Sequence, residues 1–341
     1  MRWRAALSVL VALALLPAVA VYASTQYVSG DTGVLVQHVR AVVADIGRGQ
    51  WIDWSGHFAL LQHLPAGVLV ALQLPDEGVF RGLVVLNLLV LVAITVMAYR
   101  RLRRRSEVVA ILFTSVLLSG PLLWYGHASF SELLAIALTL AMVILLLDGA
   151  RPVWVALTMV GASIAKDTSL PFVLLLALGT AFYASRAEVP WYQRLRLPTI
   201  VAGAVLSAIA VGGFNYLQFR SLTSASNLDP KYIVPTLGIQ ARFFLAIWFS
   251  PNGGVVPFWP TFAGFMVMAV AAALAQVRRT AGWRRRAVAL VPLGTAALVL
   301  GGVSIGLSKW VAPLGWIAWG PRLLLPWLPA AAYLVGAAYA D

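Results

Sequence analysis

The sequence predicts an all-α membrane protein that folds as a polytopic helical bundle, and three observations predict this class. Hydrophobic residues make up 61% of the 341 residues, and the mean hydropathy is +0.87. Apolar runs of about 20 residues, long enough to cross a bilayer as a helix, recur from end to end. Basic residues stand in short clusters between these runs, a pattern that orients spans during insertion. A soluble core of this length could not bury so much apolar surface.

The first apolar run, Ala5–Ala23, follows two arginines and contains two small-x-small sites, as a cleaved signal peptide also would. The run is longer than the core of a typical signal peptide, and many further spans follow. We therefore expect residues 5–24 to be retained as span 1. In either case the chain from Ser24 onward lies outside.

Residues 25–78 form the predicted first outer loop, which is expected to contain juxtamembrane helices. Within it, His57–Leu74 is predicted as a juxtamembrane or partly re-entrant helix. The remaining spans occupy residues 79–340, so that the chain is a single transmembrane domain of about ten helices. The sequence stops at Asp341, directly after the last predicted span, and this topology is compatible with further C-terminal chain. The nine later spans are expected at Val79–Tyr99, Val108–Trp124, Leu133–Leu147, Val153–Ala165, Leu170–Ala184, Pro198–Leu217, Phe258–Val277, Ala287–Leu307 and Leu323–Ala340.

The distribution of charge supports this topology. The predicted inner side holds 16 of the 25 basic residues, and all four histidines fall on the outer side. We therefore expect the functional face to be the outer one. The inner basic residues are Arg2, Arg4, Arg100, Arg101, Arg103, Arg104, Arg105, Arg151, Arg186, Arg194, Arg196, Arg278, Arg279, Arg284, Arg285 and Arg286.

The stretch Tyr27–Phe58 is rich in ionisable residues for a chain with only 12 acids and four histidines. Asp31 lies in it between Gly30 and Gly33, which permit a tight turn and the close approach of a ligand. A partly desolvated carboxylate at the membrane boundary suits a general base. The alternative is an aspartate that only makes the turn or caps the following helix.

Other polar residues lie at the predicted outer ends of spans. Lys166 either neutralises a neighbouring acid or holds a phosphate anion. His127 could bind phosphate or sugar, whereas Glu132 could simply begin the next helix, where acids are favoured. Arg322, close to Trp319, belongs either to an interfacial aromatic belt or to a site for a lipid-linked phosphate or a stacked sugar.

Several kinds of site are disfavoured. The chain has no cysteine, which excludes disulfides, a thiolate nucleophile and cysteine-ligated metal. No histidine pair has metal-ligand spacing, and no phosphate-binding glycine loop or nucleophile elbow is present. The net charge of +13 reflects the inner clusters rather than a nucleic-acid surface.

The order of these features resembles the GT-C integral-membrane glycosyltransferases, in particular bacterial proteins of the polyprenyl- or dolichyl-phosphate-mannose transferase type. The likeness covers the whole chain in layout: an acid just after span 1, a juxtamembrane helix in the first outer loop, and then stacked spans. Four short strings carry it: His127–Leu134 (HASFSELL), Ala165–Leu170 (AKDTSL), Phe249–Gly254 (FSPNGG) and Trp319–Pro326 (WGPRLLLP).

The resemblance implies a transferase on the extracytoplasmic side of a bacterial plasma membrane. Asp31 would be the general base, and Lys166 or Arg322 would hold the phosphate of a polyprenyl-phosphate sugar donor. The acceptor would be a glycan, lipid or protein hydroxyl. Many relatives have two adjacent acids at this position, whereas here Thr32 follows Asp31, so no metal or other cofactor is expected. The residues expected to bind substrate are Asp53, His57, His127, Glu132 and Trp319.

Two other classes of function stay open at this point. A transporter or flippase for a lipid-linked glycan should place ionisable groups at mid-membrane, often in broken helices. A non-catalytic scaffold that docks an enzyme makes no such demand. Because the ionisable groups are expected to gather at one face, the pattern favours the enzyme over the transporter.

Overall fold

The computed structural model describes residues 30–49, 60–127, 132–166, 170–185, 197–222, 233–234, 236–310 and 322–340. Within these ranges the regular elements are helices, and the one β-type pairing is an isolated bridge between Ile233 and Trp310. The predicted all-α class is confirmed for this part of the chain. Predicted span 1, residues 5–24, lies outside the described residues.

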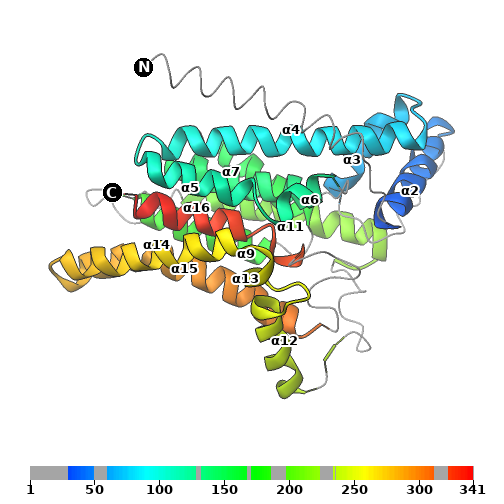
Figure 1. Ribbon diagram of the computed structural model, residues 1–341. Helices are drawn as coiled ribbons and strands as arrows, with labels where there is room; N and C mark the ends of the chain where they lie inside the picture. The colour runs from blue at the N-terminus through cyan, green and yellow to red at the C-terminus, as the bar shows by residue number, and fades with distance from the viewer. Residues whose placement is uncertain are drawn as a thin grey trace, which may run out of the picture.

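Four described helices are long and apolar enough to cross a bilayer. They have 20 to 27 residues each, or about 30–40 Å, which matches a hydrocarbon core about 30 Å thick. Figure 1 shows α4, α14 and α15 running along a common direction. The predicted membrane class therefore has support in the structure, and each of these helices coincides with a predicted span. They are α4 (Asp76–Leu102), α11 (Leu197–Phe219), α14 (Pro260–Arg279) and α15 (Trp283–Ser308).

Four shorter apolar helices occupy predicted spans 3 to 6. They have 11 to 16 residues, or about 16–24 Å, which is less than the thickness of the hydrocarbon core. The number of ten spans therefore stays a prediction. These helices are α5 (Glu107–Leu117), α7 (Glu132–Leu147), α8 (Pro152–Ala165) and α9 (Leu170–Ala184).

Predicted span 3 was wrong as one continuous helix. α5 ends at Leu117, and a second short helix, α6, covers Pro121–His127. The last of the three residues between them, Gly120, has φ +74°, a conformation that glycine adopts without steric cost. The following proline has no N–H to donate to the preceding turn, so the first helix cannot continue through it.

Trp259 packs into this break. Its indole N–H donates to the Val116 carbonyl at 2.9 Å, and the side chain is fully buried. A Cβ atom on Gly120 would lie only 2.8 Å from Trp259 Cδ1, so the absence of a side chain there lets the indole approach. Through Trp259, which precedes the first residue of α14, the start of α14 packs against the break in span 3.

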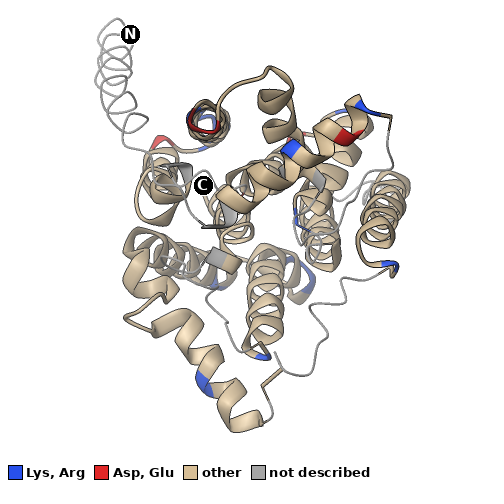
Figure 2. Cartoon of the chain, turned by 90° about the vertical axis from the view of Figure 1, so that its right-hand side faces the viewer, with Lys and Arg blue, Asp and Glu red and all other residues tan. Residues whose placement is uncertain are grey.

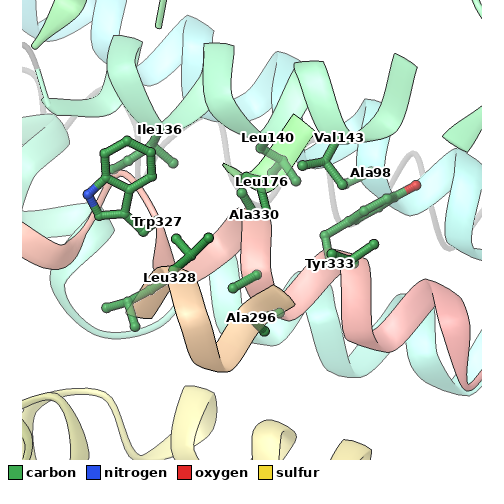
Figure 3. Close-up of a cluster of buried hydrophobic side chains, with 14 of the residues drawn as sticks. Ala98, Ile136, Leu140, Val143, Leu176, Ala296, Trp327, Leu328, Ala330 and Tyr333 are labelled. Atoms are coloured by element: carbon green, nitrogen blue, oxygen red, sulfur yellow. The ribbon is translucent and has the colours of Figure 1, made fainter. Parts of the chain in front are cut away.

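Predicted span 10 was also wrong as a membrane-length helix. Its segment forms a 3₁₀ turn, η4 (Arg322–Leu324), and an 11-residue helix, α16 (Leu328–Ala338), of about 16 Å. Every residue of α16 is buried, and the helix packs against α5, α7, α14 and α15. Figure 3 shows Trp327, Leu328 and Tyr333 among side chains of these neighbours, such as Leu140 and Ala296. α16 is a central core element, rich in alanine because the surrounding helices approach it closely.

One end of the bundle collects the arginine clusters. Arg101 pairs with Asp148 at 3.0 Å, and Arg105 donates to the Ala337 carbonyl at 2.7 Å. Tyr183 and Tyr339 donate there to the carbonyls of Ala338 and Ala289. We call this the arginine-rich end; the connection between α14 and α15, with Arg278 to Arg286, lies at it as well (Figure 1).

Close contact between α9 and α15 depends on Gly179. A Cβ atom at this position would lie 2.1 Å from Thr295 Oγ1 and 2.4 Å from its Cγ2, so a larger residue must push the helices apart. We expect Gly179→Val to destabilise the fold by about 1–3 kcal/mol and lower the Tm in detergent.

The matched control for this glycine is Gly264→Val on α14, where nothing lies within 4 Å of the added Cβ. Both substitutions change backbone freedom alike, so a similar Tm for the two variants would contradict the close packing of α9 on α15.

Candidate functional site

The first predicted outer loop contains two helices, α2 (Gly30–Gly47) and α3 (Leu60–Ala71). Arg40 of α2 donates to the Leu74 carbonyl at 2.7 Å and pairs with Asp76, the first residue of α4. The apolar faces of the two helices close a small cluster on the start of α4, formed by Leu35, Val36, Val39, Ala66, Val70, Val79 and Leu83. α3 falls inside the segment predicted as a juxtamembrane helix. No bounds were predicted for α2, which Figure 1 shows crossing the direction of α4.

The backbone around Asp31 differs from the sequence expectation. Gly30 to Gly33 are helical rather than part of a tight turn. A carboxylate in a helix N-terminal turn is favoured by the helix dipole. The structure describes the backbone of Asp31 and places it in α2.

α3 connects α4 to α11 at the end of the bundle opposite the arginine-rich end, which we call the α2–α3 end. A Cβ on Gly82 of α4 would lie 2.7 Å from Leu69 Cδ1 of α3. Further along, the His63 ring of α3 packs edge-on against Phe214 of α11, with ring centroids 5.8 Å apart. α3 also packs on α8. It therefore lies beside three helices of the bundle at this end.

His63 and His38 form a pair that the sequence analysis did not select. Their ring centroids are 5.3 Å apart, His63 is buried, and the Nε2 atom of His38 is enclosed. A signal was available, because His63 interrupts an apolar run in a chain with four histidines. The pairing itself required two helices that are separate in sequence to meet.

α7 and α8 form an antiparallel hairpin that brings Glu132 and Lys166 to the same level, that is, to the same position along the helix axes. A Cβ on Gly161 of α8 would lie 3.1 Å from Leu138 Cδ1 of α7, which sets the antiparallel register. Glu132 precedes Leu138 by six residues on α7, and Lys166 follows Gly161 by five residues on α8. Measured along the helix axes, both residues therefore lie about 8 Å from the contact between Gly161 and Leu138. Glu132 is only 4% exposed, and Lys166 is the half-buried C-cap of α8.

Phe214 lies slightly beyond this level. A Cβ on Gly203 of α11 would contact the Met159 sulfur of α8 at 2.9 Å, which aligns these two parallel helices. Lys166 follows Met159 by seven residues on α8, and Ala210 follows Gly203 by seven residues on α11, so Lys166 and Ala210 lie at the same level. Phe214 is one helical turn beyond Ala210. The rings of Phe214 and His63 therefore lie closer to the α2–α3 end of the bundle than Lys166 and Glu132 do.

The other predicted site residues are placed only in part. His127 is the last residue of α6, five residues before the first residue of α7. Arg322 begins η4, which packs on α15. For both, the structure describes the backbone. Asp53, His57 and Trp319 lie outside the described residues.

Charge in the described helices is concentrated near helix ends. The apolar helices α4, α7, α14 and α15 carry their charged residues within about two turns of an end, and α8, α9 and α11 contain none. Figure 2, which views the chain from the α2–α3 end, shows blue and red on short segments of otherwise tan helices. Within the described ranges, His, Asp and Glu side chains form no group of three that could hold a metal ion.

This arrangement puts a buried glutamate and a half-buried lysine at the same level on two adjacent helices, with the rings of Phe214 and His63 further toward α3. Comparison of the chain with protein-family models, curated proteins and solved structures found no match. Chemically, such a site can hold an anionic group through lysine and accept a hydrogen bond from a hydroxyl through glutamate.

Proposed function

We propose that the chain is a membrane glycosyltransferase that moves a sugar from a polyprenyl-phosphate donor to an acceptor hydroxyl. The observation that carries the proposal is the common level of Glu132 and Lys166 at the α2–α3 end. The helix that contains Asp31 packs at this same end. A lysine for the donor phosphate and carboxylates for the hydroxyl groups are the parts that this reaction needs.

In the proposed reaction Asp31 takes the proton of the acceptor hydroxyl. The acceptor oxygen bonds to the anomeric carbon as the bond from that carbon to the phosphate oxygen breaks, and the polyprenyl phosphate leaves. This single displacement inverts the anomeric centre. Lys166 or Arg322 stabilises the negative charge of the phosphate, while Glu132 orients a sugar hydroxyl. Asp53, His57, His127 and Trp319 are the further proposed substrate-binding residues.

The position of the ionisable groups distinguishes this proposal from transport. An ion-coupled transporter places ionisable groups at mid-membrane, facing a cavity. Among the described membrane-length helices, α4, α14 and α15 have their charged residues near the ends, and α11 contains none. The direct test is sugar transfer by the purified protein from a polyprenyl-phosphate donor to added acceptors. Movement of the lipid-linked donor across vesicles without transfer would instead favour a flippase.

Lys166 provides a test of donor binding. We expect Lys166→Ala to weaken donor affinity by about 1.5–3 kcal/mol, because it removes a charge-assisted contact to phosphate. The same loss is expected for Arg322→Ala, measured as donor Kd.

Lys309→Ala is the matched control for Lys166. Lys309 is also a helix C-cap, at the end of α15, and its structural contact is made by its backbone carbonyl, which accepts from Val234 N at 2.8 Å. If the Lys166 and Arg322 variants bound donor as tightly as the Lys309 variant, both phosphate assignments would be withdrawn.

The topology can be tested with single cysteines, since the chain has none of its own. We expect Asn252→Cys, beside α13 (Val255–Phe258), to react with an impermeant maleimide in intact cells. Ala281→Cys, between α14 and α15, should react only after the membrane is opened. Both positions are exposed. The opposite labelling pattern would place the proposed site on the inner face.

A further inference from the structure

The segment between α11 and α14 contains an apolar helix that does not follow the direction of the bundle. α12 (Leu237–Phe249) was not predicted, since no helix was expected between the predicted spans Pro198–Leu217 and Phe258–Val277. It has 13 residues, or about 20 Å, too short for a core of about 30 Å. Figure 1 shows it running across the direction of α14 and α15.

α12 is held at the α2–α3 end by its flanking contacts. Trp248 Nε1 donates to Ser304 Oγ of α15 at 3.1 Å. At the other end of the helix, Gln240 donates to the Val234 carbonyl, and Val234 N donates to the Lys309 carbonyl, where α15 has just ended. The helix is therefore fixed at the level where a membrane-length helix leaves the bundle.

The face of α12 that points away from α15 is apolar. Ile247 is the one buried residue of the helix, whereas Leu245 is 56% and Phe249 62% exposed. The only charged residue of α12 is Arg242, which lies on the same exposed side by helical periodicity. Because apolar side chains occupy both faces of α12, exposure of either face to water is unfavourable.

We propose that α12 is an interfacial helix that lies in the plane of the bilayer surface, with Leu245 and Phe249 in the lipid. Three observations select lipid as the occupant: the helix lies across the direction of the spans, it sits where α15 ends, and Trp248 contacts Ser304, next to the exposed apolar residue Ile305 of α15. A single arginine on an apolar helix can extend its charged group to the headgroups. This inference does not depend on the proposed glycosyltransferase activity.

The test uses the full chain with one cysteine at Leu245, labelled with the fluorophore NBD and reconstituted in phosphatidylcholine–phosphatidylglycerol vesicles. We expect lipids with a doxyl quencher near the headgroup to quench this probe more strongly than lipids quenched deep in the acyl chain. Iodide in the buffer should have little effect. A second reporter at Phe249, four residues on, guards against a local effect of one substitution.

Two matched reporters calibrate depth. Val267→Cys, exposed near the middle of α14, should show the reverse order of lipid quenching, and Ala281→Cys should respond to iodide. Strong iodide quenching at Leu245 would place α12 in water and overturn the proposal. Stronger quenching by the deep lipid would make it an embedded helix, and protection from every quencher would mean that protein covers it; either result also overturns the proposal.

Discussion

Asp31→Asn is expected to lower turnover by about 10²–10⁴-fold, the usual contribution of a positioned general base. A sugar hydroxyl is a poor nucleophile at neutral pH, so its proton must leave as the glycosidic bond forms. Asparagine keeps the size of the side chain but cannot take the proton. Insertion, expression and donor affinity should stay close to those of the wild type, and the loss should appear in kcat.

Asp45→Asn is the matched control for this variant. Asp45 lies on the same helix and pairs with Arg48 at 2.6 Å on the surface, so the substitution should have little effect on turnover. Glu132→Gln tests the second carboxylate to which the proposed reaction gives a role. Full activity of Asp31→Asn together with an inactive Glu132→Gln would move the base to α7 and refute the role given to Asp31.

Trp259→Ala should destabilise the fold more than any other single substitution considered, by about 3–5 kcal/mol, the usual cost of truncating a large buried aromatic residue. The indole is fully buried and fills the break between α5 and α6. Its loss leaves a cavity and removes the donor to the Val116 carbonyl. The measurement is the free energy of unfolding in micelles, or the Tm where unfolding is irreversible.

Two further variants separate the causes. Trp259→Phe keeps most of the ring but lacks the N–H, and should cost about 1–3 kcal/mol for the unsatisfied buried carbonyl. Trp283→Ala removes an indole that is 75% exposed at the start of α15, and should change stability by less than about 0.5 kcal/mol. Equal effects of Trp259→Ala and Trp283→Ala would show that the break does not depend on the indole.

Hydropathy located the helices well where a run was long and uninterrupted. The predicted spans Val79–Tyr99 and Ala287–Leu307 correspond to α4 and α15, and Leu170–Ala184 has the same bounds as α9. It failed at Gly120-Pro121, where the apolar run continues although the helix does not. Hydropathy averages over side chains and does not register the backbone conformation that a glycine before a proline adopts.

The sequence by itself determined the class of the protein, the position of most helices and the gathering of charge at their ends, because these depend on the cost of placing apolar or charged groups in water or lipid. Only the tertiary structure decided that α16 is enclosed, that α12 lies across the bundle, and that Glu132 and Lys166 share a level. The hydropathy of an apolar residue is the same whether it faces lipid or another helix, so the sequence does not distinguish the two positions. Its neighbours depend on helix register, which small residues such as Gly161 and Gly203 set by letting one helix approach another.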